Sequence, residues 1–295
     1  MPTDAGNDIL PGAGALAPPH SPPPAGRIIG GYCLGRRLGG RGAAAVHLAQ
    51  DRRGHRVVIK TVRRASTGGD AQWRRFAAEC AFLEAVRDPQ VVRGYGHGVV
   101  GDVAWLAMEY LPGGTLREHL RGGVAAQHAL SLLRQAARGL AAAHRRGIVH
   151  RDLKPENLLL REGHLVLTDF GVAARAGDAQ ASAGAGRLVG TARYVAPEQV
   201  QGEAPDPRAD VYSLGVLFHE MLCGEPPFPG RTAVELLAQH LVAPVPRLPA
   251  PLAAWQDLSD RLLAKQPQER PAHADAVLQE IQRVAPGSWG GAGAD

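Results

Sequence analysis

The stretch HRDLKPEN, residues 150–157, is the most informative part of this sequence. It carries a carboxylate on Asp152, an ammonium group on Lys154 and a carboxamide on Asn157. Farther along the chain, a run of apolar residues leads into Asp169-Phe170-Gly171. An Asp-x-Gly tripeptide alone usually marks a turn, but an eight-residue string of this kind is very unlikely to occur by chance. The two segments together therefore point to chemistry.

These residue types match what phosphoryl transfer requires. The reaction needs a base near the attacking hydroxyl, oxygen ligands for Mg²⁺, and cations over the phosphates. Asp152 can act as the base, and Asn157 and Asp169 can provide the oxygen ligands. Lys60 and Lys154 can provide the cations. The sequence therefore predicts a site for phosphoryl transfer.

Composition limits the other functions that this chain can have. Its 295 residues are 45% hydrophobic, which is enough for a sizeable core, and no apolar run approaches the roughly 18 residues of a membrane span. The net charge of +5 comes from scattered arginines, and only 5% of residues are aromatic, so we expect no nucleic-acid partner. Cys33, Cys80 and Cys223 lie far apart and form no CxxC pair, which favours a reducing, cytoplasmic location.

The two ends of the chain differ from its middle. Residues 1–27 are rich in Pro, Gly and Ala and predict a disordered leader, whereas the Gly-rich residues 285–295 predict a flexible tail. Between them, β-branched runs predict strands in the first third, and apolar residues at helical spacing predict helices after a Pro-Gly-Gly segment. This order predicts an α+β fold with two lobes and a cleft between them.

The same motifs resemble those of bacterial eukaryotic-like (Hanks-type) serine/threonine protein kinases over about residues 32–283, and they follow the order typical of that family. They comprise the glycine-rich segment Leu38–Val46, the strand Val57–Lys60, the gatekeeper and hinge Met108–Leu111, residues 150–157, Asp169–Gly171, Ala196–Glu198, Asp210 and Arg270. Lys154 and the pair Gly190-Thr191 resemble the serine/threonine branch of the family.

The resemblance implies a bilobal protein-kinase fold over residues 28–284. We expect a small antiparallel β-sheet with one main helix in an N-lobe of about 28–108, a hinge at 109–114, and a larger, mainly helical C-lobe at 115–284. It also implies ATP and Mg²⁺ as cofactors, with Mn²⁺ as a substitute. The expected reaction is transfer of the γ-phosphate to Ser/Thr hydroxyls of protein substrates, including autophosphorylation within a homodimer.

The resemblance also assigns catalytic roles. Asp152 is the expected base, with Lys154 beside it and Thr191 helping to position both. Lys60 is expected to contact the α- and β-phosphates and to pair with a glutamate of the N-lobe helix. A helical projection leaves both Glu79 and Glu84 open, but the spacing that is typical of the family selects Glu79.

Nucleotide and metal contacts follow from the same resemblance. The expected nucleotide-binding residues are Leu38, Gly39, Gly40, Gly42, Val46, Val58, Lys60, Met108, Glu109, Leu111 and Leu159. Glu109 and Leu111 are expected to contribute only backbone groups. Val46, Val58 and Leu159 are expected to sandwich the base, although ordinary core packing explains these three equally well. Asn157 and Asp169 are the expected metal ligands.

Several further residues are expected to have structural or regulatory roles. Asp210 is expected to anchor the backbone of residues 150–157, and His150 to pack against Phe170. Glu198 and Arg270 are expected to form a buried ion pair. Arg151 is a candidate partner for a phosphorylated Ser182, which is otherwise simply an exposed loop residue.

Three residues depart from the family pattern. Arg41 replaces the middle glycine of the glycine-rich segment, and Val58 replaces an alanine. Gly94 stands where an apolar residue is expected behind the helix, which predicts a gap there. A pseudokinase and a small-molecule kinase are therefore alternative interpretations. Retention of the four polar residues Lys60, Asp152, Asn157 and Asp169 argues against the first, and the segment 190–198 argues against the second.

Overall fold

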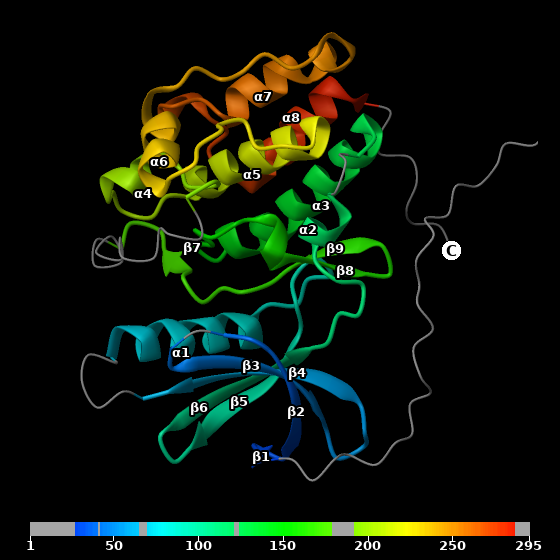
Figure 1. Ribbon diagram of the computed structural model, residues 1–295, viewed down its shortest axis with the longest axis vertical. Coiled ribbons are helices and arrows are strands. Elements are labelled where there is room, and N and C mark those ends of the chain that lie inside the picture. Colours follow the sequence, from blue (N-terminus) through cyan, green and yellow to red (C-terminus); the bar gives the residue numbers. More distant parts are fainter. Residues whose placement is uncertain (1–26, 41, 65–69, 121–123, 179–191, 287–295) are drawn as a thin grey trace, which may run out of the picture.

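The computed structural model describes residues 27–40, 42–64, 70–120, 124–178 and 192–286. Arg41, Ser182 and Thr191, together with residues 1–26 and 287–295, lie outside the described residues. The described chain forms two stacked lobes, a β-sheet with one long helix and a larger helical lobe (Figure 1). The α+β bilobal fold expected from the sequence is therefore confirmed. No helix in the described ranges has the length and apolar character needed to span a membrane.

The N-lobe is built on a six-stranded antiparallel sheet in the order β1-β2-β3-β4-β6-β5. The strands are β1 (Ile28–Ile29), β2 (Tyr32–Gly39), β3 (Ala44–Gln50), β4 (Arg56–Arg63), β5 (Gly94–Val100) and β6 (Val103–Glu109). Side chains alternate between the two faces of a strand. Val58, Lys60 and Val62 of β4 therefore share one face of the sheet, while Ile59 and Thr61 lie on the other.

Helix α1 (Asp70–Ala85) covers the Lys60 face of this sheet through buried side chains that include Phe76, Cys80 and Leu83. A Cβ atom placed on Gly94 of β5 would lie only 3.1 Å from Leu83 Cβ. The predicted gap at Gly94 is therefore wrong, because Leu83 of the helix already fills the space that a larger side chain would need.

The C-lobe packs around one buried helix, α5 (Pro207–Cys223), which contacts α3, α7 and α8. Its Val211, Leu214, Leu217 and Phe218 are fully buried. The other helices are α2 (Leu116–His119), α3 (Ala126–His144), α4 (Pro197–Gln201), α6 (Ala233–Val242), α7 (Gln256–Leu262) and α8 (Ala274–Val284). Two short strand pairs complete the lobe, namely β7 (Ile148–Val149) with β10 (Ala174–Arg175), and β8 (Leu158–Arg161) with β9 (His164–Leu167).

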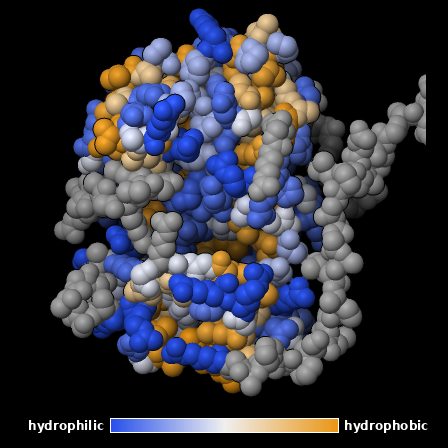
Figure 2. Space-filling view, in the orientation of Figure 1, coloured by the Kyte–Doolittle hydropathy of each residue, from blue (hydrophilic) through white to orange (hydrophobic). Residues whose placement is uncertain are grey.

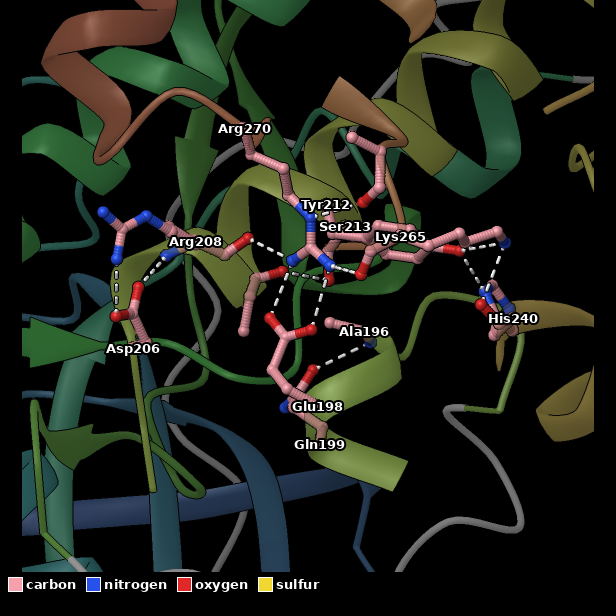
Figure 3. A network of polar contacts seen from close by, with 12 residues as sticks. Ala196, Glu198, Gln199, Asp206, Arg208, Tyr212, Ser213, His240, Lys265 and Arg270 are labelled. Carbon is pink, nitrogen blue, oxygen red and sulfur yellow. Dashed lines mark hydrogen bonds and ion pairs between the residues drawn. The ribbon is translucent and has the colours of Figure 1, made fainter. Parts of the chain in front are cut away.

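A buried ion pair fastens α4 to the segment between α7 and α8 (Figure 3). Arg270 Nη1 and Nη2 lie 2.7 and 3.0 Å from the two carboxylate oxygens of Glu198, and both residues are buried. The same guanidinium donates to the carbonyl groups of Ala264, Lys265 and Arg208. Because every polar atom of this pair has a partner, the predicted structural ion pair is confirmed.

Candidate active site

The loop between β7 and β8 carries residues 150–157 and is anchored by Asp210 of α5. The carboxylate of Asp210 accepts hydrogen bonds from the backbone N–H groups of His150 and Arg151, each at 2.7 Å, and from His144 Nε2 at 2.9 Å. Burial by itself would raise the pKa of Asp210, but the hydrogen bond and charge of His144 hold it below the usual value. The predicted anchoring role of Asp210 is therefore confirmed.

Two residues of the site have left-handed backbone conformations. Arg151 has φ = 67° and Asp169 has φ = 59°, values that are uncommon for residues other than glycine. Contacts on both sides hold the Arg151 backbone, because its N–H donates to Asp210 and its carbonyl accepts from Gln199 Nε2 at 3.1 Å. Backbone strain of this kind persists where the surrounding structure enforces it, and it concentrates at functional sites.

Asp152 lies at the centre of a compact polar group. Lys154 Nζ is 2.6 Å from Asp152 Oδ2, and Asn157 Nδ2 donates to the same oxygen at 3.1 Å and to the Asp152 carbonyl at 2.7 Å. The side chains of Asp152 and Lys154 are only 13% and 19% exposed. The structure thus brings together the carboxylate, ammonium and carboxamide that are adjacent in the sequence.

A second polar group connects the two lobes. Lys60 Nζ of β4 lies 2.8 Å from both carboxylate oxygens of Glu79 on α1 and 2.7 Å from Asp169 Oδ1. Burial alone would lower the pKa of Lys60, but the charges of Glu79 and Asp169 raise it above its usual value. Burial alone would raise the pKa of Asp169, but Lys60 lowers it to about 2. Both groups are therefore ionised at neutral pH.

The two polar groups are adjacent. The backbone N–H of Thr168 donates to the Asn157 carbonyl at 2.9 Å, which places Asp169 beside the loop of Asp152. His150 packs edge-on against Phe170, with 4.8 Å between ring centroids, as predicted from the sequence. Phe170 also contacts Phe82 of α1 at 4.2 Å between centroids, so the position of Asp169 depends on the helix.

Figure 2 shows a hollow between the lobes, and the predicted nucleotide-binding residues come from strands of both lobes and from the segment that joins them. Val46 pairs with Lys60 across β3 and β4, and Val58 pairs with Met108 across β4 and β6, so these side chains share one face of the sheet. Leu159 is partly buried below, packed against the main core. This arrangement can form apolar walls for a flat ring.

The glycine-rich turn connects β2 and β3, and the hinge follows β6. Gly40 has φ = 109°, and a Cβ atom there would lie 2.4 Å from the Ala44 carbonyl oxygen, so only glycine fits. Leu38 and Gly39 are exposed and Gly42 has φ = 58°. In the hinge, Leu111 is buried, whereas the N–H of Glu109 already donates to the Arg93 carbonyl at 2.9 Å. Any contact of Glu109 with a base therefore uses its carbonyl group.

The residues expected to hold Mg²⁺ fit a metal that is shared with phosphates. Within the described ranges, no group of three or more His, Cys, Asp or Glu side chains is arranged to hold a metal ion. Mg²⁺ at phosphate sites usually takes only one or two side-chain ligands, with phosphate and water supplying the others. Asp169 is 48% exposed, and Asn157 turns its Nδ2 toward Asp152, so its Oδ1 is the end that would ligate the metal.

One group of residues beside the site was missed in the sequence analysis. Arg117 of α2 donates to Glu156 at 2.8 Å, to Glu220 of α5 at 2.5 Å, and to the Tyr194 hydroxyl. The Tyr194 hydroxyl in turn donates to Glu220 at 2.5 Å. These residues are far apart in the sequence and share no motif spacing, so no local signal could have identified the group.

Comparison with known proteins gives a consistent family assignment. Residues 32–281 match the family model described as "Protein kinase domain". The chain is 38% identical over 262 residues to Serine/threonine-protein kinase PknL of Mycobacterium bovis and of Mycobacterium tuberculosis, covering 86% of this chain and 65% of each relative. It is 36% identical over 268 residues to Serine/threonine-protein kinase PknB of Mycobacterium leprae, covering 87% of this chain and 43% of that relative. The chain thus spans less than two thirds of the length of these curated relatives.

Proposed function

This chain belongs to the protein kinase family, in its bacterial Hanks-type serine/threonine branch, and on that premise we propose that it transfers the γ-phosphoryl group of ATP to Ser/Thr hydroxyls of protein substrates. The observation that carries the proposal is the adjacency of the Asp152–Lys154–Asn157 group to the Lys60–Glu79–Asp169 group. Each group concentrates ionisable side chains at the boundary between the lobes.

We propose the following roles for the residues of this site. Asp152 orients the substrate hydroxyl and accepts its proton, while Lys154 offsets negative charge as it develops. Lys60, held by Glu79, binds phosphate oxygens. Asn157 and Asp169 would hold Mg²⁺, which would supply positive charge to neutralise the phosphates. Thr191, which lies outside the described residues, is proposed to help position Asp152 and Lys154.

The nucleotide base is proposed to bind between the two lobes. The carbonyl of Glu109 and the backbone of Leu111 would hold its polar edge, with Val46 and Val58 of the N-lobe against one face of the ring and Leu159 of the C-lobe against the other. The supporting observation is that Val46 and Val58 share one face of the N-lobe sheet, while Leu159 lies on β8 of the C-lobe. Leu38, Gly39, Gly40 and Gly42 are proposed to lie over the phosphates, with Met108 at the back of the pocket.

The proposed partners and location follow from the proposed activity. Protein substrates with Ser/Thr acceptors are the expected partners, and a second copy of this chain is one of them if the protein autophosphorylates. A cytoplasmic location is supported by Cys33, Cys80 and Cys223, which lie far apart in the sequence and form no CxxC pair.

Incubation with labelled ATP, Mg²⁺ and a generic protein substrate tests the proposal. Wild-type protein should incorporate label, and Asp152→Asn should lower the rate by about 10²–10⁴-fold while calorimetry shows nearly unchanged binding of Mg-nucleotide. Asp102→Asn, at an exposed aspartate of the N-lobe sheet, is the matched control and should behave like wild type. Near wild-type turnover of Asp152→Asn would remove Asp152 from the mechanism. If the wild type neither transferred phosphate nor bound nucleotide, the pseudokinase interpretation would replace this one.

A further inference from the structure

A cavity in the N-lobe lies on the face of the sheet that is turned away from α1. It has a volume of about 510 Å³ and is bounded by residues of β1, β2, β3, β4 and β6. Ala45 of β3 pairs with Thr61 of β4 on its floor, and Ala43 continues that floor toward the glycine-rich turn. Because both alanines present only a methyl group, they leave this side of the sheet hollow. We call this space the sheet cavity.

The sheet cavity is surrounded by positive charge. Arg27, Arg37 and Arg63 line it, and none of its lining residues is acidic within the described part of the chain. Arg63 Nη1 lies 3.4 Å from the carboxylate of Asp102, in a pair whose two side chains are exposed. Exposed ion pairs of this kind contribute little to the stability of the fold, and they leave the guanidinium able to bind another anion.

A histidine on the floor of the sheet cavity has an unsatisfied polar atom. His47 lies directly opposite Arg37 in the β2–β3 register, and its Nδ1 is buried without a hydrogen-bond partner among the described residues. Burial and the charges of Arg37 and Arg27 hold the pKa of His47 below its usual value. An anion in the sheet cavity would offset the repulsion between a protonated His47 and the two arginines.

The opposite wall of the cavity is apolar. Ile29 and Val103 are buried and Leu34 is partly buried where they line it. The space is larger than a phosphate group alone, and it combines a basic side with an apolar side. The paired N–H donors of arginine match the oxygens of a phosphate group, and an organic group attached to the phosphate can occupy the apolar side.

We propose that the sheet cavity binds a small phosphate monoester, a site separate from the one proposed for ATP. The phosphate lies between Arg37 and Arg63, near His47. The organic part of the ligand packs against Ile29, Leu34 and Val103. This binding does not require catalysis, so it can be tested independently of the kinase activity.

The sheet cavity is connected to the glycine-rich turn through Arg37. Arg37 Nε donates to the Gly39 carbonyl and Nη2 to the Gly40 carbonyl, each at 3.1 Å. A guanidinium has five N–H groups, so these two bonds leave others for an anion. An anion that holds the Arg37 side chain therefore also holds the turn in the conformation that the structure describes.

Phenyl phosphate is a suitable probe, with inorganic phosphate as its minimal form. Binding is followed by calorimetry and by the NMR signals of the His47 ring, in protein saturated with a non-hydrolysable Mg-nucleotide so that the cleft is occupied. Wild-type protein should bind phenyl phosphate saturably and more tightly than inorganic phosphate, and the pKa of His47 should rise on binding. A His47 ring that does not respond at saturation would overturn the proposal.

Arg63 and Arg56 provide a matched pair of variants, because they are exposed arginines at the two ends of β4 and only Arg63 lines the sheet cavity. Arg63→Gln should weaken phenyl phosphate binding by at least about fivefold, whereas Arg56→Gln should change it by less than about twofold. Equal weakening by both variants would indicate general attraction of anions to a basic surface and would refute the site. Ala45→Leu, which fills the cavity without removing charge, should abolish binding, and its unfolding midpoint checks that it folds.

The effect of phenyl phosphate on Mg-nucleotide affinity provides a second readout. If phenyl phosphate holds the glycine-rich turn through Arg37, it should tighten Mg-nucleotide binding by about two- to fivefold in the wild type and in Arg56→Gln. The effect should be absent in Ala45→Leu. If phenyl phosphate instead weakens nucleotide binding equally in all three proteins, it competes in the cleft and the proposed connection is wrong.

Discussion

Lys60 of the N-lobe sheet lies 2.8 Å from both carboxylate oxygens of Glu79, whose side chain is 1% exposed. The pair fastens α1 to β4 at the depth where the two lobes meet, and it directs the remaining donor of Lys60 to Asp169 at 2.7 Å. A lysine held on two sides has a defined position, whereas a free lysine on a flexible stem does not.

Replacement of Glu79 by glutamine should therefore impair phosphoryl transfer more than it impairs folding. We expect kcat/KM to fall by about 10²-fold, because small displacements of a phosphate-binding cation are costly in the transition state. Steady-state kinetics measure the effect. Glu84→Gln is the matched control, since Glu84 is exposed on the same helix, and it should stay within about twofold of the wild type. Equal losses in the two variants would contradict a special role for Glu79.

Removal of the Arg270 side chain should destabilise the C-lobe strongly. Arg270→Met leaves the buried carboxylate of Glu198 without its partner, and we expect a loss of about 3–5 kcal/mol in the free energy of unfolding. Arg261→Met, which breaks an exposed pair with Glu280, should cost less than about 1 kcal/mol. Denaturant unfolding followed by circular dichroism would show the difference, and similar losses in the two variants would refute the argument.

The free energy of unfolding should depend on the charge balance between Arg117 and Glu220. Arg117→Met leaves Glu220 buried and unpaired, so we expect a loss of about 3 kcal/mol in the free energy of unfolding. Adding Glu220→Gln removes the unpaired charge and keeps an acceptor for Tyr194, so the double variant should recover part of the loss. Thermal unfolding of the wild type, of Arg117→Met, of Glu220→Gln and of the double variant completes a double-mutant cycle. Strictly additive effects would show that Arg117 and Glu220 do not depend on each other.

Stability should fall in acid because of His240. This residue is buried, its Nδ1 contacts the Tyr212 hydroxyl at 2.9 Å, and Phe228 packs edge-on against its ring. Burial and the nearby charge of Lys265, whose Nζ donates to the His240 carbonyl (Figure 3), lower the pKa of His240 to about 4. The unfolded chain takes up this proton near pH 6.5, so it binds more protons than the folded chain between pH 6.5 and 4.

The free energy of unfolding should therefore decrease by up to about 3 kcal/mol as the pH falls from 7 to 4. In His240→Gln this part of the pH dependence should disappear, although the variant is less stable at pH 7. Denaturant titrations of both proteins at several pH values measure the difference between the two profiles. Parallel profiles would mean that His240 does not titrate in this range.

Much of the fold could be predicted from the sequence because it is encoded in local patterns. The β-branched runs of the first third predicted strands, and the helical spacing of Val211, Leu214, Leu217 and Phe218 predicted the face of α5 that is now seen to be fully buried. The gap predicted at Gly94 was wrong for a physical reason. The missing side chain of a glycine can leave a cavity or can let a neighbouring residue approach. At Gly94 the space is filled by Leu83, a contact that the sequence does not reveal.

By itself, the sequence determined the chemistry that this protein carries. The residue types of 150–157 and 169–171 are close along the chain, so their meeting required little from the rest of the fold. The tertiary structure decided the contacts between distant segments. It placed Glu79, and not Glu84, beside Lys60, joined Arg117 to Glu220, and set Arg37 beside the sheet cavity. Such contacts depend on how lobes and strands pack, and a one-residue shift in register would turn each side chain to the opposite face.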